Sequence, residues 1–344
     1  MDITKYIRPN ILSLAPYSTA RDEYQGEIGI YLDANENPYD NNYNRYPDPH
    51  QKELKKVISE IKKVSTENLF LGNGSDEAID LVFRIFCEPK IDEALIIKPS
   101  YGMYSVCAKI NDVKFTEAAL SADYELIAED LLKAVTPETK VIFLCSPNNP
   151  SGNLLNRKEV NKVITSFDGI VVIDEAYIDF SEDEGYVPEL SKYPNLIVLQ
   201  TLSKAWGLAG LRVGMAYASA EIIDFMNKVK YPYNINCSTQ QIVLNELTAK
   251  RADKQSELAE IIKERDAFIA ELQNIDYIKK IYKTDANFVL VKTKNADGLY
   301  EFLINEKIIV RNRSRVFGCS DTLRITIGTP EENKKLLTIL KTRV

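Results

Sequence analysis

The sequence predicts an α/β protein built on a parallel sheet, followed by a smaller α+β domain. Three observations predict this class: short apolar runs alternate with helical patterns, the runs are apolar on consecutive residues, and the pattern changes after about residue 235. Strands that are apolar on both faces suit a sheet covered by helices on both sides. With 344 residues, 45% of them hydrophobic, the chain can bury a large core.

The predicted strands of the large sheet are five apolar runs in the middle of the chain. In three of these runs a polar cluster begins where the apolar residues stop, and ligands of parallel sheets bind at such carboxyl ends. The chemistry is therefore expected at this edge. In chain order the runs are ALIIKPS, KVIFLCSPNNP, GIVVIDEAY, NLIVLQTLSK and GMAYAS.

The rest of the chain divides into an arm and a second domain. Before residue 30 the sequence is irregular, with Pro9 and Pro16, which predicts an N-terminal arm over residues 1–30 that is laid on another surface. The large domain is then expected over residues 31–234. Residues 235–344 show a long helical pattern and then the strand candidates FVLVKT, KIIVRNR and LRITIG, which predict a small α+β domain.

Composition excludes several classes of function. The charge is mixed, with 43 Lys and Arg against 50 Asp and Glu, so we expect no nucleic-acid partner. No apolar run approaches the roughly 20 residues that cross a bilayer, and the start lacks a signal-peptide core, so a cytoplasmic protein without membrane contact is expected. The five scattered cysteines show no metal-ligand spacing, and the single histidine, His50, disfavours triad or His-rich zinc chemistry.

The first motif with chemical potential is LGNGSDEAIDLVFRIF, where a turn leads into a helix. Its first residues, Gly74, Ser75 and Asp76, offer free backbone N–H groups that can bind phosphate. An ordinary helix start capped by Ser75 is the alternative. The chain contains no GxxxxGK[ST] loop, which argues against nucleotide binding.

Two further motifs follow strand candidates. SPNNPSG precedes a strand that ends in Asp174 and Tyr177, and a buried carboxylate there needs a cation or a proton, unless Asp174 caps a neighbouring loop. In TLSKAWGLAGLRVG, Lys204 stands beside Ala205 and Trp206, which can depress its pKa and make it a Schiff-base nucleophile. An ordinary surface lysine is the alternative.

The order of these motifs resembles the fold-type I pyridoxal-phosphate-dependent aminotransferases of class II. The segments IRPNILSLAPYSTARDEY, LDANENPY, NRYPDP and LRITIGTPEE resemble the histidinol-phosphate aminotransferase branch of that family, so the likeness covers nearly the whole chain. The resemblance implies a mostly parallel seven-stranded sheet sandwiched by helices.

The resemblance also implies a cofactor site. Pyridoxal 5'-phosphate would be held covalently as an aldimine on Lys204, which would also carry protons, while Asp174 would keep the ring nitrogen protonated. Tyr177 and Asn149 would contact the phenolic oxygen, and Tyr101 would stack on the ring. The groups implied for the phosphate are Gly74, Ser75, Asp76, Thr201, Ser203 and Arg212, with Tyr46 reaching in from the partner subunit of a homodimer with composite active sites.

The implied reaction is reversible amino transfer between L-glutamate and imidazole acetol phosphate, which gives 2-oxoglutarate and L-histidinol phosphate in histidine biosynthesis. Arg311 and Arg324 are the expected anion clamps, because arginine pairs with both carboxylate and phosphate. Arg313 and Arg315 would share a face with Arg311 on an extended segment, so the choice among the three stays open. Tyr17 and Asn35 either complete the pocket or anchor the arm.

Three alternatives to this reaction stand. An aromatic aminotransferase would differ mainly in the pocket around the substrate side chain, and a decarboxylase would act on threonine phosphate. A non-catalytic ligand sensor would be expected to lack the lysine or the acidic strand end, but both Lys204 and Asp174 are present.

Overall fold

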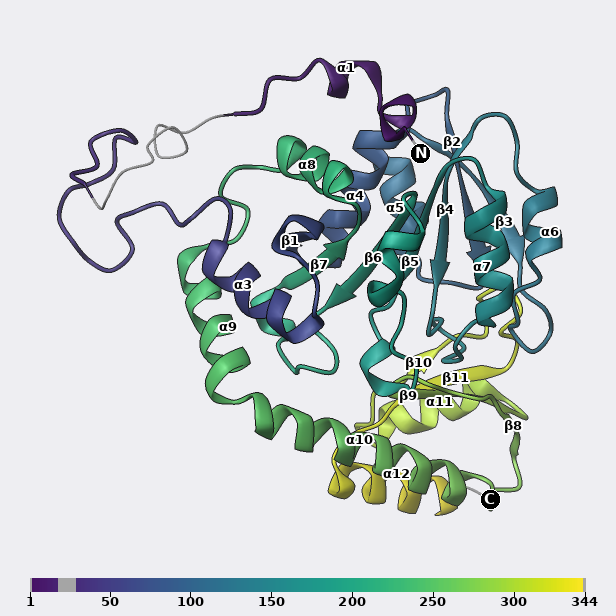
Figure 1. Cartoon of the computed structure of the whole chain (residues 1–344). Helices are drawn as coiled ribbons and strands as arrows, with labels where there is room; N and C mark the ends of the chain where they lie inside the picture. Colours follow the sequence, from purple (N-terminus) through teal and green to yellow (C-terminus); the bar gives the residue numbers. More distant parts are fainter. Residues whose placement is uncertain (1, 18–28, 343–344) are drawn as a thin grey trace.

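The large domain is an α/β layered structure around a seven-stranded sheet, as seen in a computed structural model that describes residues 2–17 and 29–342 (Figure 1). Within these residues the strand order is β1-β7-β6-β5-β4-β2-β3. Only β7 runs antiparallel to its neighbours. The strands are β1 (Leu69–Asn73), β2 (Glu93–Lys98), β3 (Lys114–Ala119), β4 (Thr139–Cys145), β5 (Ile170–Asp174), β6 (Leu196–Thr201) and β7 (Val213–Tyr217).

The predicted α/β class is confirmed, and each of the five apolar runs contains a strand. Two strands were not among the candidates. β1 has only five residues, and β3 is an edge strand whose KFTEAA sequence leaves several side chains exposed, so neither forms a long apolar run.

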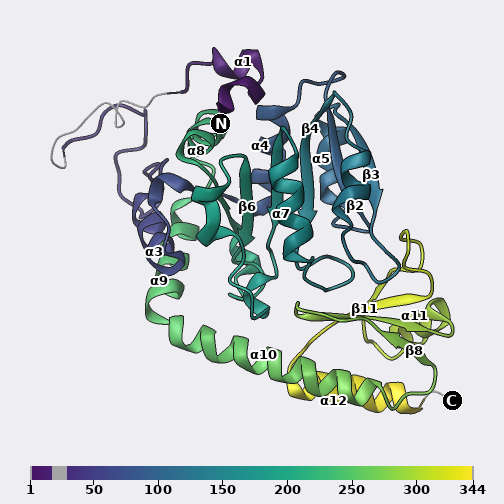
Figure 2. The ribbon, with the colours of Figure 1, turned by 45° about the vertical axis from the view of Figure 1, so that its right-hand side comes forward.

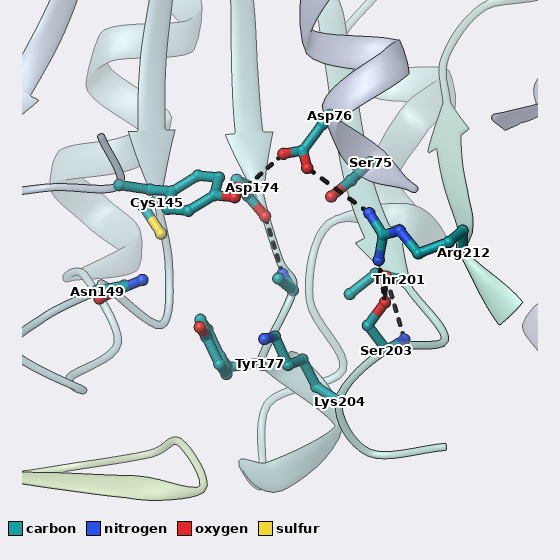
Figure 3. Close-up of a pocket in the computed structure, with 12 residues that line it drawn as sticks. Ser75, Asp76, Cys145, Asn149, Asp174, Tyr177, Thr201, Ser203, Lys204 and Arg212 are labelled. Carbon is teal, nitrogen blue, oxygen red and sulfur yellow. Dashed lines mark hydrogen bonds and ion pairs between the residues drawn. The ribbon is translucent and has the colours of Figure 1, made fainter. Parts of the chain in front are cut away.

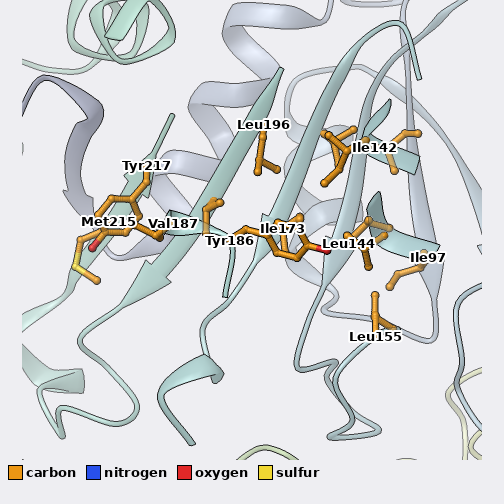
Figure 4. Packing of buried hydrophobic residues seen from close by; sticks show 14 of the residues in the cluster. Ile97, Ile142, Leu144, Leu155, Ile173, Tyr186, Val187, Leu196, Met215 and Tyr217 are labelled. Carbon is orange, nitrogen blue, oxygen red and sulfur yellow. The ribbon is translucent and has the colours of Figure 1, made fainter. Parts of the chain in front are cut away.

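Two hydrophobic clusters sandwich the sheet, because alternate residues of each strand point to opposite faces. In β5, Val171 and Ile173 belong to the first cluster, and Ile170 and Val172 belong to the second. Figure 4 shows part of the first cluster, where residues of adjacent strands such as Leu144 of β4 and Ile173 of β5 lie side by side. Burial of one such side chain contributes about 1.5–3 kcal/mol.

Helices cover both faces of the sheet. The first cluster includes residues of α3 (Lys52–Lys62), α6 (Ala128–Lys133), α7 (Arg157–Ser166) and α9 (Cys237–Ala249). The second includes residues of α4 (Ser75–Phe86), α5 (Met103–Ile110) and α8 (Ala220–Val229). Short 3-10 turns complete the domain: η2 (Thr66–Asn68), η3 (Ile178–Phe180), η4 (Val187–Lys192) and η5 (Ala209–Leu211).

The small domain packs along the helix α10 (Arg251–Leu272), as Figure 2 shows. Its antiparallel sheet has the order β10-β11-β9-β8 within the described residues, and its own core includes Phe268, Val289 and Leu336. The elements are β8 (Ile278–Ile281), β9 (Phe288–Thr293), α11 (Ala296–Asn305), β10 (Arg311–Asn312), β11 (Thr322–Thr326) and α12 (Pro330–Thr342).

The strand predicted at KIIVRNR is shorter than expected. Only Arg311 and Asn312 pair with β11. Lys307 has a left-handed conformation (φ 63°) just after α11, and residues 308–310 connect it to β10 without regular structure. At the start of the chain, η1 (Ile3–Tyr6) and α1 (Pro9–Leu12) dock on the large domain, where Ile3 is buried and Arg8 pairs with Glu88 at 3.0 Å. Residues 18–28 of the predicted arm lie outside the described residues.

In the described part of the chain, no helix is both long and apolar enough to cross a membrane.

Candidate active site

A cavity opens at the carboxyl ends of β4, β5 and β6, beside the first turn of α4 (Figure 3). The structure brings together most of the predicted cofactor contacts there, as well as Cys145 and Ala176, which the sequence did not indicate. The predicted residues that line the cavity are Ser75, Asp76, Tyr101, Asn149, Asp174, Tyr177, Thr201, Ser203, Lys204 and Arg212.

One end of the cavity is built to receive an anion. Gly74 precedes α4 with φ 75° but does not line the cavity, and its predicted free N–H instead donates to the Arg212 carbonyl at 2.8 Å. Ser75 and Asp76 in the first turn of this 12-residue helix do line it, and helix N-termini bind anions. Arg212 lies beside them: its Nη1 donates to Ser203 Oγ at 3.3 Å, and its Nη2 lies 3.7 Å from a carboxylate oxygen of Asp76. Thr201 Oγ1 donates to Ser203 Oγ at 3.0 Å. Amides, hydroxyls and a guanidinium together suit a phosphate group.

A buried carboxylate lies at the end of β5. Asp174 is 3% exposed; its Oδ2 accepts a hydrogen bond from Tyr104 Oη at 2.7 Å, and its Oδ1 accepts one from the Ala176 amide at 3.0 Å. Burial raises the pKa of Asp174, whereas the bonds from Tyr104 and Ala176 lower it. Among the described residues no lysine or arginine forms an ion pair with this carboxylate. The carboxylate is therefore available to a cationic ligand.

Lys204 supplies an amine that points into the cavity (Figure 3). Its Nζ lies 5.7 Å from the ring centroid of Tyr177. Burial lowers the pKa of Lys204 most, and the positive charge of Arg324 lowers it further, while the charge of Asp174 opposes both effects. A lowered pKa increases the fraction of neutral amine, which is the nucleophilic form.

The small domain reaches the cavity through β9 and β11. Arg324 Nη1 donates to Asn149 Oδ1 at 2.5 Å, and the Arg324 guanidinium lies over the ring of Phe288 at 5.1 Å. Phe288 also packs edge-on against Tyr177, with 5.1 Å between centroids. Arg324 therefore contacts the large domain at the cavity itself.

A group of arginines stands at this side of the cavity. Arg311 and Arg324 are direct partners across β10 and β11. Burial lowers the pKa of Arg313 to about 10, and the charges of Arg324 and Arg311 contribute to the same shift. The Nε atoms of Arg313 and Arg324 are buried and have no hydrogen-bond partner in the described part of the chain. Among the same residues, no carboxylate forms an ion pair with Arg311, Arg313 or Arg324. Clustered cations without an acidic partner are suited to bind an anion.

The sequence pattern of the family described as Aminotransferase class I and II matches residues 31–340 of this chain. The chain belongs to the class I and II aminotransferase family. Its relatives include the histidinol-phosphate aminotransferase of Parabacteroides distasonis, which is 52% identical over 340 residues, with coverage of 99% of this chain and 98% of the relative. The enzyme of the same name from Flavobacterium psychrophilum is 47% identical, with coverage of 99% and 98%.

Solved structures share the architecture of this aminotransferase. The histidinol-phosphate aminotransferase from Clostridium acetobutylicum has a TM-score of 0.80 and 30% identity, with coverage of 87% of this chain and 90% of that one. L-threonine-O-3-phosphate decarboxylase from Porphyromonas gingivalis has a TM-score of 0.72 at 21% identity, with coverage of 87% and 90%, and supports the fold alone. The predicted fold-type I architecture is confirmed.

Several predicted contacts of the aminotransferase site do not line the cavity within a single chain. Tyr17 is 72% exposed, and Asn35 is exposed with a left-handed φ of 54°. Tyr46 is half exposed and stacks on Tyr233, with 4.4 Å between the ring centroids. Arg315 is also exposed. The roles of these residues stay predictions.

Sequence reasoning missed Tyr104, the hydroxyl donor to Asp174. The signal that could have found it is the spacing in YGMY, because two tyrosines three residues apart at a helix start lie close together. Their rings do meet edge-on, with 5.6 Å between the centroids of Tyr101 and Tyr104.

Proposed function

We propose that this aminotransferase carries out reversible amino transfer between L-glutamate and imidazole acetol phosphate, the reaction of a histidinol-phosphate aminotransferase. Relatives of that name match nearly the whole chain at about half identity. The structural observation that carries the proposal is the group formed by Arg311, Arg313 and Arg324 beside the Lys204 cavity. It suits a substrate with an anionic tail close to its reacting amine.

The donor set of the cavity fits pyridoxal phosphate. The α4 amides and Arg212 suit its phosphate, Asp174 lacks a cation among the described residues and suits a protonated ring nitrogen, and Lys204 offers an amine between them. When bound, this group acts as a sink for the electron pair left by proton removal from the substrate. We infer that Lys204 carries it covalently.

The protein groups then have separate tasks. The substrate amine would first displace Lys204 Nζ from the cofactor and so set the lysine amine free. Lys204 Nζ would then take the proton from the substrate carbon that bears the amine, and its lowered pKa favours the neutral amine that this step needs. Asp174 holds a proton at the ring nitrogen. Tyr177 Oη and Asn149 Nδ2 donate toward the ring oxygen, and Asn149 can do so because its Oδ1 is occupied by Arg324.

The two substrates share one anion site in this proposal. Glutamate presents carboxylates, whereas histidinol phosphate presents a phosphate ester, and a guanidinium binds either group as a fork. We propose Arg324 and Arg311 as the shared clamps, with Tyr17 and Asn35 as further contacts.

A homodimer completes the site in this proposal. Tyr46 lies at the end of the segment that spans residues 29–46, where it is half exposed and stacks on Tyr233, and it is proposed to contact the phosphate of the partner subunit. Exposed apolar side chains of the same segment, such as Leu32 (87%) and Tyr39 (82%), support a covering partner.

The test is the visible absorption of the protein loaded with pyridoxal phosphate. L-Glutamate should convert the spectrum to that of the aminated cofactor, and imidazole acetol phosphate should restore it. A loaded protein that responds to glutamate without recovery by the imidazole ketone would disprove the substrate assignment. Faster turnover of phenylalanine would favour an aromatic aminotransferase, and carbon dioxide release from threonine phosphate would favour a decarboxylase.

A further inference from the structure

Tyr104 lies behind the cavity and does not line it. It is the second residue of α5 and is fully buried, with its ring stacked on Phe143 at 5.0 Å between centroids. The same ring meets Tyr101 edge-on, and its hydroxyl donates to Asp174 Oδ2 at 2.7 Å. One side chain therefore contacts both the carboxylate at the end of β5 and the aromatic ring that borders the cavity.

The hydroxyl of Tyr104 is the side-chain donor that fixes the Asp174 carboxylate among the described residues. The other oxygen accepts from the Ala176 amide, which belongs to the backbone that follows β5. A carboxylate held at both oxygens has a fixed plane, so its direction toward the cavity is set before a ligand arrives. Such preorganisation removes the cost of reorienting the group on binding.

The same bond favours the charged form of Asp174. Burial raises the pKa of this carboxyl, and the Tyr104 hydroxyl is the strongest of the groups that oppose the rise. A hydrogen bond to a charged group is stronger than one between neutral groups. Loss of the hydroxyl would leave a buried carboxylate with a single donor.

We propose that Tyr104 is a positioning residue for the cofactor site, which orients Asp174 toward the ring nitrogen and holds it as a carboxylate. This inference rests on the proposed function, because Asp174 meets a ring nitrogen only if the cavity holds pyridoxal phosphate. Tyr104 itself touches neither the cofactor nor the substrate. Its effect passes through Asp174.

The experiment compares Tyr104→Phe with Tyr217→Phe. Tyr217 is also fully buried, but it lies on the opposite face of the sheet and its hydroxyl has no partner in the described part of the chain. Each variant loses one buried hydroxyl and keeps its ring. Thermal unfolding without cofactor reports any general loss of stability, and titration with pyridoxal phosphate reports affinity.

We expect Tyr104→Phe to bind pyridoxal phosphate at least tenfold more weakly and to lose about tenfold to a hundredfold in kcat, in line with the loss of a charge-assisted hydrogen bond. KM for the amino donor should change less than threefold. The visible absorption of the loaded protein changes with pH as the nitrogen that joins Lys204 to the cofactor gains or loses a proton. The midpoint of this change should move to higher pH, because a cofactor ring that is less protonated makes this nitrogen more basic. Tyr217→Phe should match the wild type in all of these measurements.

A double-mutant cycle separates positioning from packing. In an Asp174→Asn background, the further change Tyr104→Phe should leave cofactor affinity and the pH midpoint unaltered, because the carboxylate it serves is gone. Independent, additive losses would overturn the proposal, as would a Tyr104→Phe protein with wild-type affinity and pH midpoint. A wild-type chain that takes up no pyridoxal phosphate would instead overturn the proposed function and this inference together.

Discussion

Arg324 of the small domain donates a hydrogen bond of 2.5 Å from Nη1 to Oδ1 of Asn149 in the large domain. This bond gives the Asn149 amide a defined orientation, with Nδ2 left to donate into the cavity. Arg324 also lies among the arginines proposed to bind the substrate anion. A single guanidinium therefore connects the substrate side of the site to a cofactor contact.

Arg324→Gln should weaken cofactor binding as well as substrate binding. We expect kcat/KM for both substrates to fall by tenfold to a hundredfold or more, which is the usual effect of losing a charge-assisted hydrogen bond. Arg311→Gln is the matched control, because Arg311 pairs with Arg324 across β10 and β11 but is not bonded to Asn149. It should lower kcat/KM and leave the affinity for pyridoxal phosphate unchanged. Equal cofactor affinity in both variants would contradict this coupling.

Arg313 should distinguish a phosphate ester from a carboxylate. Its guanidinium is partly buried beside Arg311 and Arg324 and adds a further positive charge there. A phosphate has a charge of about −1.5 to −2 at pH 7, so this added charge attracts it more strongly than it attracts a carboxylate. Arg313→Gln should therefore raise KM for histidinol phosphate more than tenfold and KM for glutamate less than threefold. Arg315→Gln, at an exposed neighbouring position, should change neither value. Equal effects of Arg313→Gln on both substrates would refute a selective role.

The sequence could predict the large-domain site because its residues lie at the carboxyl ends of strands, and these ends meet at one edge of the sheet. Asp174, Asn149 and Lys204 each come after an apolar run, and parallel strands bring such positions together without any further information. Tyr104 could not be assigned in this way. Its bond to Asp174 joins residues 70 positions apart and depends on how α5 packs against the sheet.

The arginine side of the site was only partly predictable for the same reason. The extended spacing placed Arg311, Arg313 and Arg315 on one face, but the paired strand ends at Asn312. Beyond that point the alternation no longer holds, and Arg315 is exposed while Arg313 is partly buried. Arg313 and Arg315 therefore differ in exposure because the strand ends before them, and the sequence pattern did not show where it ends.

Gly74→Ala should weaken phosphate binding. Gly74 has φ 75°, and a Cβ at this position would overlap Nη2 of Arg212, so the substitution strains the backbone and displaces the guanidinium. We expect at least tenfold weaker affinity for pyridoxal phosphate. Gly102→Ala is the control, because that glycine has φ −67° and no atom within 4 Å of an added Cβ. Wild-type cofactor affinity in Gly74→Ala would show that Arg212 is not displaced.

Glu175 should make stability depend on pH. It directly follows β5 and is 2% exposed, and its oxygens accept from the Tyr186 amide at 2.6 Å and from Gln200 Nε2 at 2.9 Å. Burial raises its pKa to about 7, against the lowering effect of both bonds and of the charge on Lys62. Between the ordinary value of 4.5 and about 7, the folded chain therefore binds more protons at this site than the unfolded chain.

The stability that protonated Glu175 contributes is thus complete below pH 4.5 and is lost as the pH rises through about 7. Glu175→Gln removes this dependence on pH. Gln200 Oε1 is buried without a partner in the described residues. If the Gln200 amide rotates by half a turn, this oxygen can accept a hydrogen bond from the new glutamine amide. Relative to the wild type, the free energy of unfolding of Glu175→Gln should rise by about 3 kcal/mol between pH 4.5 and pH 8. Urea unfolding across this range measures the difference, with the exposed substitution Glu60→Gln as a control that should stay level. A Glu175→Gln difference that is flat or falls with pH would mean that Glu175 is already ionised in the folded protein at low pH.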